Sequence, residues 1–129
     1  MIGSADEFHR LRTSDDLEEQ RRASLEPAEE RVWIDIVERY PSLRRWVAHN
    51  KTVPLSILSV LATDRDPEVR SAVAMKRKLD RKMFELLARD PEPSVRCRLA
   101  WNRKTPADLL AKLASDPEDF VANAARERT

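Results

Sequence analysis

The chain has 129 residues, with 24 Lys and Arg, 23 Asp and Glu, 41% hydrophobic residues, one Gly, eight Pro and one Cys. This length fits one domain of ordinary size, and the abundance of charge with almost no Gly favours helices joined by short Pro-containing turns over a sheet. The single cysteine, Cys97, excludes an intrachain disulfide and a cysteine-cluster metal site.

Residues 1–40 are acidic, with 11 Asp and Glu against 6 Lys and Arg. We predict two or three amphipathic helices within residues 4–40, with the richest apolar face in the segment 27–40. The predicted core positions are Phe8, Leu11, Leu17, Leu25, Val32, Trp33, Ile36 and Val37. We therefore expect residues 1–40 to form an N-terminal helical cap whose last helix packs on the segment that follows.

Residues 41–129 carry an internal repeat with a period of about 26 residues. One column holds Pro41, Pro67 and Pro93, the next holds Leu43, Val69, Val95 and Val121, and a later one holds Leu61, Leu87 and Leu113. Apolar residues within each period fall at helical spacing in two blocks, so each period predicts a helical hairpin. We expect a first helix of about eight residues, partly 3₁₀ in character, and a second of about ten.

The predicted helix starts combine a side-chain oxygen with a following proline. Asp66, Glu92 and Thr105 each precede a proline, which indicates an N-cap followed by proline at the first helical position. Asp108 lies three residues after Thr105, which is the spacing of a capping box.

A hairpin this small cannot cover its own apolar face, so neighbouring hairpins must stack on it, and about three are needed. The sequence therefore predicts an all-α solenoid, with residues 1–40 as its cap and residues 41–129 as its array.

Acidic residues recur where each second helix ends, at Glu38, Asp64, Asp90 and Asp116. A carboxylate is disfavoured at a helix C-terminus, so another interaction must hold it there. The periodic arginines Arg44, Arg70 and Arg96 each stand six residues after one of these acids. We predict a structural ladder of Asp and Arg, with capping of the next helix as an addition and a ligand-binding row of arginines as the alternative.

Two segments, DPEVRSAVAMKRKLDRKMFELLARD (66 to 90) and EPSVRCRLAWNRKTPADLLAKLASD (92 to 116), resemble leucine-rich repeat variant units, a bacterial class related to HEAT and armadillo repeats. The resemblance covers residues 41–125 and implies short alternating helices in a right-handed superhelix. Lys76 and Asp80 depart from the pattern. The iron–sulfur segment of some relatives does not transfer to a chain with one cysteine, and the family has no common activity.

Basic residues concentrate in the turns between the two helices of each period: Lys51, Lys76, Arg77, Lys78, Arg103 and Lys104, with Arg81 just beyond. Stacked turns would present a basic ridge suited to a phosphate backbone or to an acidic protein face. Solvated charges without a partner are the alternative. Trp46 and Trp101 are candidates for base stacking or for a protein contact, with packing as the alternative.

No set of residues has the spacing of a catalytic or metal site, and we predict no cofactor. Cys97 shares a column with Arg45 and Ser71, so we expect it to be partly exposed. Arg96 and Arg98 beside it would lower its pKa, but no base accompanies it, which favours an inert thiol.

The sequence therefore predicts a non-enzymatic scaffold that binds another protein, by analogy with bacterial repeat proteins that act as adaptors or toxin-immunity proteins. The alternative is nucleic-acid binding through the basic ridge. The absence of a secretory pattern and of a long apolar segment predicts a cytoplasmic protein that does not contact a membrane. The sequence defines no oligomeric state.

Overall fold

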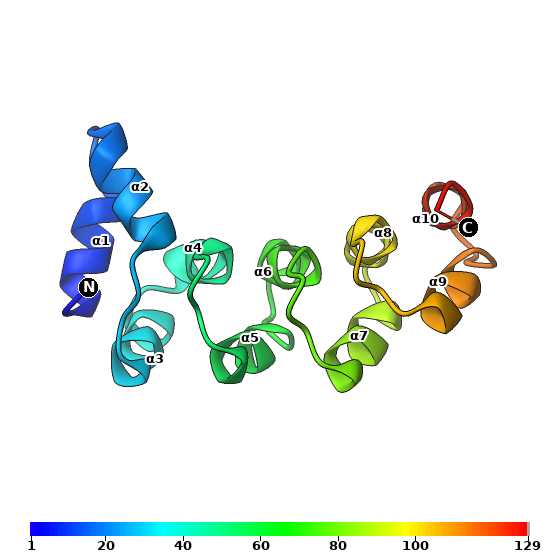
Figure 1. Ribbon diagram of the computed structural model, residues 1–129, viewed down its shortest axis with the longest axis horizontal. Helices are drawn as coiled ribbons and strands as arrows, with labels where there is room; N and C mark the ends of the chain where they lie inside the picture. Colours follow the sequence, from blue (N-terminus) through cyan, green and yellow to red (C-terminus); the bar gives the residue numbers. More distant parts are fainter. Residues whose placement is uncertain (129) are drawn as a thin grey trace. The chain divides into compact units, whose positions relative to one another are not determined.

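The computed structural model describes residues 1–128; Thr129, the last residue of the predicted array, lies outside the described residues. Residues 1–128 form ten α-helices and one 3₁₀ helix, η1, with no strand (Figure 1). The all-α class predicted from the sequence is confirmed. Residues 1–128 divide into two compact units, Met1–Leu61 and residues 62–128.

The first unit contains α1 to α5 and η1. Their bounds are α1 Ala5–Thr13, α2 Leu17–Leu25, α3 Glu30–Arg39, η1 Pro41–Leu43, α4 Arg44–His49 and α5 Leu55–Leu61. Phe8 of α1 meets Trp33 of α3 edge to face, with ring centroids 5.7 Å apart and planes at 76°. Both rings are fully buried, so this contact centres the core of the unit. Helix α3 also packs against η1, α4 and α5, as expected for the last helix of the N-terminal segment.

The prediction that Leu17 and Leu25 belong to this core is wrong. Leu17 is 76% exposed and Leu25 is 38% exposed. They are the first and last residues of α2, whereas the buried residue of that helix is Ala23. Ile2, which precedes α1, is buried and its backbone N–H donates to Pro27 O at 2.8 Å.

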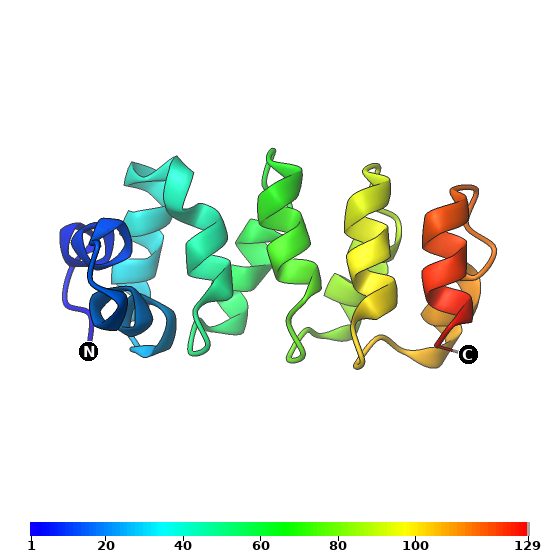
Figure 2. The same cartoon turned by 90° about the horizontal axis from the view of Figure 1, so that it is seen from above.

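The second unit contains α6 to α10. Their bounds are α6 Pro67–Ala74, α7 Arg81–Ala88, α8 Pro93–Trp101, α9 Ala107–Leu113 and α10 Asp119–Arg126. Helices α6, α8 and α10 lie side by side in one layer, and α7 and α9 form a second layer (Figures 1 and 2). Apolar residues spaced three or four apart fill the space between the layers. They include Val69, Val73, Met83, Phe84, Leu87, Val95, Leu99, Leu109, Leu113 and Val121.

The N-caps predicted from the sequence are confirmed only in part. Asp66 caps α6, because its carboxylate accepts a hydrogen bond from the Glu68 backbone N–H at 2.9 Å. Glu92 occupies the N-cap position of α8 but makes no side-chain capping bond.

The predicted capping box of α9 is wrong. Helix α9 begins at Ala107, and Pro106 is its N-cap with an extended ψ of 142°. The buried Thr105 hydroxyl donates to Leu99 O at 2.6 Å, near the end of α8, and α9 has no side-chain capping bond. Asp108 pairs with Arg81 of α7.

The relative lengths of the helices also differ from the prediction. Helices α5, α7 and α9 have seven, eight and seven residues, whereas α6 and α8 have eight and nine. Among the described residues the only 3₁₀ segment is η1. The extended proline at position 106 shows why a second helix is shorter than its apolar pattern suggests, because the helix starts after the proline rather than at it. None of the helices in residues 1–128 has both the length and the apolar character that crossing a membrane requires.

Candidate binding site on residues 62 to 128

Two arginines of the second unit form bidentate ion pairs with aspartates 20 residues further along the chain. Arg70 donates to the two carboxylate oxygens of Asp90 at 2.7 and 3.2 Å. Arg96 donates to those of Asp116 at 2.8 and 3.0 Å. The side chains of these arginines are 14% and 13% exposed, and those of the aspartates 5% and 6%. The third donor, Nη1, reaches the backbone carbonyl of the acid six residues earlier, Asp64 or Asp90, at 2.7 Å.

The same aspartates also hold the turn that follows them. Asp90 Oδ1 accepts from the Glu92 backbone N–H at 2.9 Å, and Asp116 Oδ1 accepts from that of Glu118 at 3.0 Å. Burial raises the pKa of Asp116, but the hydrogen bonds from Arg96 and Glu118 outweigh it and bring the pKa below its ordinary value. The hydrogen bond to Asp116 correspondingly raises the pKa of Arg96. The donors of these arginines are thus occupied within the unit, which is a structural use rather than a ligand-binding one.

The remaining members of the predicted ladder lie in different units. Arg44 belongs to α4 of the first unit, where its Nε donates to Val37 O at 2.7 Å. Asp64 belongs to the second unit, where its Oδ1 accepts from the Asp66 backbone N–H at 2.9 Å.

A buried asparagine joins the turn after α8 to the turn after α6. Asn102 is 6% exposed, and its amide donates to Ala74 O at 2.8 Å and to Lys76 O at 2.6 Å. Its Oδ1 accepts from the Lys104 backbone N–H at 2.9 Å. In the first unit Asn50 makes the corresponding bonds to Ala23 O and Glu26 O. This role was not predicted, although asparagine at equivalent positions of two periods was the signal for it.

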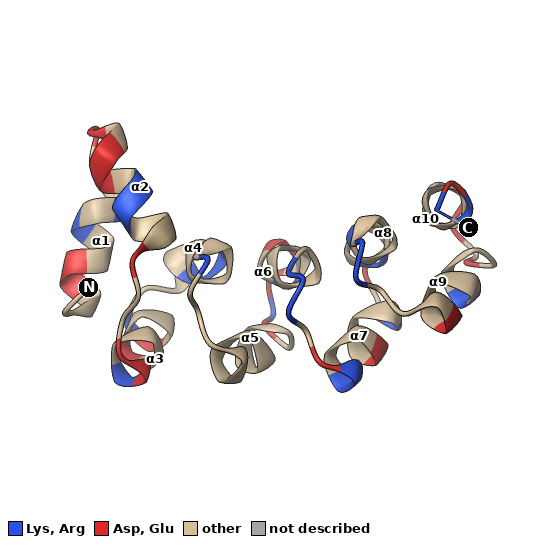
Figure 3. Ribbon diagram, in the orientation of Figure 1, with Lys and Arg blue, Asp and Glu red and all other residues tan. Residues whose placement is uncertain are grey.

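The joined turns carry four exposed bases, Arg77, Lys78, Arg103 and Lys104. Figure 3 shows Lys and Arg gathered in these two turns. No ion pair engages any of the four among residues 1–128, and we call them the basic cluster. Lys76, also predicted for the ridge, is half-buried.

Arg81 stands apart from the basic cluster. Its guanidinium donates to Glu85 at 2.7 Å and to both oxygens of Asp108 at 2.8 and 2.5 Å. These hydrogen bonds raise the pKa of Arg81 and lower that of Asp108 to about 2. Because Glu85 of α7 and Asp108 of α9 pair with its charge, Arg81 does not belong to the basic cluster.

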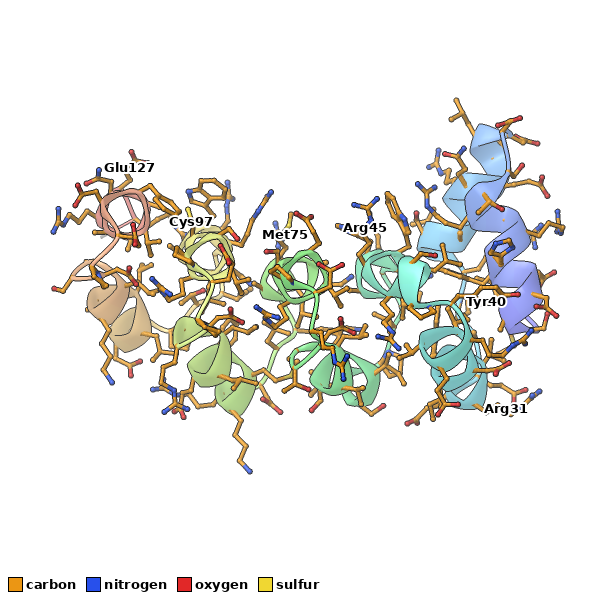
Figure 4. All side chains as sticks on the ribbon, turned by 180° about the vertical axis from the view of Figure 1, so that it is seen from behind. Arg31, Tyr40, Arg45, Met75, Cys97 and Glu127 are labelled. Atoms are coloured by element: carbon orange, nitrogen blue, oxygen red, sulfur yellow. The ribbon has the colours of Figure 1, made fainter. Side chains whose placement is uncertain are left out.

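A small cavity lies beside the basic cluster. It has a volume of about 190 Å³ and is lined by Met75, Arg77, Arg98, Trp101, Asn102 and Arg103, and we call it the Trp101 pocket. The Arg98 guanidinium lies 5.5 Å from the centroid of the Trp101 ring and 3.7 Å from Met75 Sδ. Met75 and Cys97, labelled in Figure 4, belong to the turn after α6 and to α8. No acid lines the pocket, so it can accept an anionic group beside a flat ring.

The other predicted binding residues lie in the first unit. Lys51 is exposed, and its backbone N–H donates to Ser24 O at 2.9 Å. Trp46 is half-buried, with the Arg12 guanidinium 3.5 Å and the Arg45 guanidinium 4.9 Å from its ring centroid. These two arginines cover the Trp46 ring, so Trp101 is the more accessible of the two candidate stacking residues.

The expected exposure of Cys97 is wrong. Its side chain is buried on α8, and burial raises the pKa of its thiol despite the opposing charge of Arg98. Among residues 1–128 no group of three or more His, Cys, Asp or Glu side chains has metal-binding geometry.

In the first unit, the imidazole ring of His9 stacks on the ring of Tyr40, with ring centroids 4.7 Å apart.

Comparison of the chain with models of known protein families found no match, and neither did comparison with curated proteins or with solved structures. The function is therefore inferred from the residues of the second unit.

Proposed function

We propose that this chain is a non-enzymatic helical-repeat scaffold that binds an acidic surface of another protein through the basic cluster and the Trp101 pocket. The observation that supports this most directly is the concentration of charge without internal balance. Arg77, Lys78, Arg103 and Lys104 are exposed in two adjoining turns, and no acid within residues 1–128 pairs with them.

Unbalanced like charges held close together repel one another and attract an oppositely charged partner. The three buried hydrogen bonds of Asn102 keep the two turns together, so the repulsion between their bases is maintained rather than relieved. The half-exposed Trp101 adds the kind of aromatic anchor that is enriched in protein interfaces.

The scaffold we propose is a right-handed α-α solenoid of about three 26-residue hairpins, of the leucine-rich repeat variant type. Recurrence of bonding supports it, because the pair Arg70 and Asp90 is repeated one period later by Arg96 and Asp116. The Arg128 guanidinium, one period after Asn102, likewise donates to a backbone carbonyl, that of Ala100, at 3.1 Å. We place the protein in the bacterial cytoplasm, as an adaptor or a toxin-immunity protein.

Nucleic-acid binding is the second candidate, and the Trp101 pocket is the observation that favours it. Exposed aromatic rings beside positive side chains also bind single strands, with bases stacked on the rings and phosphates on the cations. One exposed ring supplies a single stacking position, so we rank this function below protein binding.

The test compares the wild-type protein with the double variant Arg77→Glu/Arg103→Glu and with Lys112→Glu, a control on α9 in the other layer. A protein captured from an extract of the source cells is purified and its affinity for each variant is measured by calorimetry. We expect the double reversal to weaken binding at least tenfold and the control to bind as the wild type does. Equal affinities for all three would refute the proposed surface.

The same proteins are titrated with single-stranded and duplex DNA and RNA at low and physiological salt. Binding to a nucleic acid with a steep salt dependence, in the absence of a protein partner, would replace the first function by the second.

A further inference from the structure

The Trp101 pocket presents two different kinds of wall. Arg77, Arg98 and Arg103 contribute three positively charged side chains to its lining, whereas Trp101 and Met75 contribute an aromatic and a thioether side chain. Trp101 is 54% exposed and Met75 is 49% exposed, so both are accessible to a ligand. Asn102, the sixth lining residue, uses its amide in hydrogen bonds within the fold and forms part of the frame.

The charged wall is suited to more than one negative charge. No carboxylate lines the pocket, and the contacts of Arg98 are a cation–π contact with Trp101 and a long contact with Met75 Sδ. Three guanidinium groups around one small cavity are not balanced by a single carboxylate. A phosphate monoester carries about −1.5 to −2 charges at neutral pH and has three acceptor oxygens for arginine donors.

The apolar wall is suited to an aromatic ring. Both a thioether sulfur and an indole ring make favourable contacts with an aromatic ring that packs against them. The volume of about 190 Å³ is below the roughly 300 Å³ at which small-molecule sites begin, and it is of the size of one side chain.

We infer that the Trp101 pocket binds an aryl phosphate, and specifically a phosphotyrosine side chain of the partner protein. The phosphate group would accept hydrogen bonds from the three arginines. The tyrosine ring that carries it would lie against Trp101 and Met75. This inference rests on the proposed function, since it takes the partner to be a protein, and it makes binding dependent on phosphorylation of that partner.

The first experiment uses three small probes and the indole N–H signals of the three tryptophans in a ¹⁵N-labelled protein. Phenyl phosphate carries both the ring and the anion, inorganic phosphate only the anion, and phenol only the ring. We expect phenyl phosphate to shift the Trp101 signal saturably, and the other two probes to bind at least about tenfold more weakly. The signals of Trp33, which is fully buried, and Trp46, in the first unit, serve as internal references.

The variant Arg77→Gln/Arg103→Gln should weaken the binding of phenyl phosphate at least about tenfold. The control Lys112→Gln should leave the affinity for phenyl phosphate unchanged. In Trp101→Leu, binding is monitored through the methyl signal of Met75. This variant should bind phenyl phosphate more weakly than the wild type does and inorganic phosphate equally well. Unchanged methyl signals of Val73 and Leu99, which are fully buried in the second unit, show that a variant is folded. Equal binding of phenyl phosphate and inorganic phosphate, or no binding of either, would overturn the inference.

The second experiment compares peptides of one sequence that carry phosphotyrosine, phosphoserine, tyrosine or glutamate at the central position, together with a single-stranded oligonucleotide. We expect the phosphotyrosine peptide to bind at least tenfold more tightly than the other peptides. Tightest binding of the oligonucleotide would overturn the inference in favour of nucleic acid. Binding of a partner protein to the basic cluster with no preference for phosphotyrosine would refute the pocket inference and leave the proposed function standing.

Discussion

Replacement of Asp90 by Asn removes the charge from one of the two buried ion pairs of the second unit. Breaking a buried ion pair from one side typically costs about 3 to 5 kcal/mol, because the remaining charge loses its partner. Here Arg70 keeps its bonds to the carbonyls of Asp64 and Arg65, at 2.7 and 3.1 Å, and is 14% exposed, so we expect a loss of about 2 to 3 kcal/mol. Urea unfolding followed by circular dichroism measures this free energy.

The matched control is Glu85→Gln on α7. Glu85 pairs with Arg81 at 2.7 Å, but the two side chains are 45% and 50% exposed. Solvent screens such a pair, and we expect its loss to destabilise the protein much less than Asp90→Asn does. A double-mutant cycle of Arg70→Met with Asp90→Asn should give a coupling of at least about 1 kcal/mol. If Asp90→Asn destabilises no more than Glu85→Gln does, the buried pairs do not hold the unit together.

Three further predictions concern single residues of the same unit. The pKa of Asp116 lies below its ordinary value in the folded protein, so its ion pair stabilises the fold above about pH 5 and this contribution is lost as the pH falls through 4 and below. Denaturation at several pH values should therefore show a difference between wild type and Asp116→Asn that shrinks on acidification. Asn102→Ala should lower the free energy of unfolding by about 1 to 3 kcal/mol, because it leaves buried carbonyls without donors. Cys97 should react with a thiol reagent at least about a hundredfold more slowly in the folded protein than in urea.

Each of these predictions has an opposing outcome. A difference between wild type and Asp116→Asn that stays constant or grows on acidification would mean that the folded protein does not depress this pKa. An Asn102→Ala protein as stable as wild type would show that the bonds between the two turns are dispensable. Equal reaction rates of Cys97 in native and denaturing buffer would show that the thiol is accessible from solvent.

The sequence predicts the helices well where an apolar pattern and a local cap coincide. Asp66 precedes Pro67, and the helix starts where the pair indicates. Thr105 precedes Pro106 in the same way, yet its hydroxyl bonds to the Leu99 carbonyl instead. Local spacing cannot distinguish these two cases, because the extended conformation of Pro106 and the direction of the Thr105 hydroxyl, toward the end of α8, are defined only once the turn has folded.

The burial of a single side chain is harder to predict from equivalent positions of the repeat alone. Cys97 aligns with Arg45, which is exposed, and with Ser71, which is half-buried, and yet Cys97 is buried. A small side chain can turn inward where a long charged one in the same column extends to solvent. Leu17 is the converse case, since it is apolar but lies exposed at the first position of α2.

The candidate site depends on a distinction that periodicity by itself does not make. The column of Arg70 and Arg96 and the column of Arg77 and Arg103 both recur with the period of the array. The first is largely buried, and its guanidinium groups bond to carboxylates 20 residues away. The second is exposed and has no ion pair among the described residues.

A paired and buried arginine column stabilises the fold, so its recurrence is accounted for within the chain. An unpaired column does the opposite, because repeated like charges in adjoining turns repel one another. No ion pair within residues 1–128 engages Arg77 or Arg103, and Asn102 holds the two turns together. We infer that the offsetting charge comes from a bound partner, which is why the second column, rather than the first, marks the binding surface.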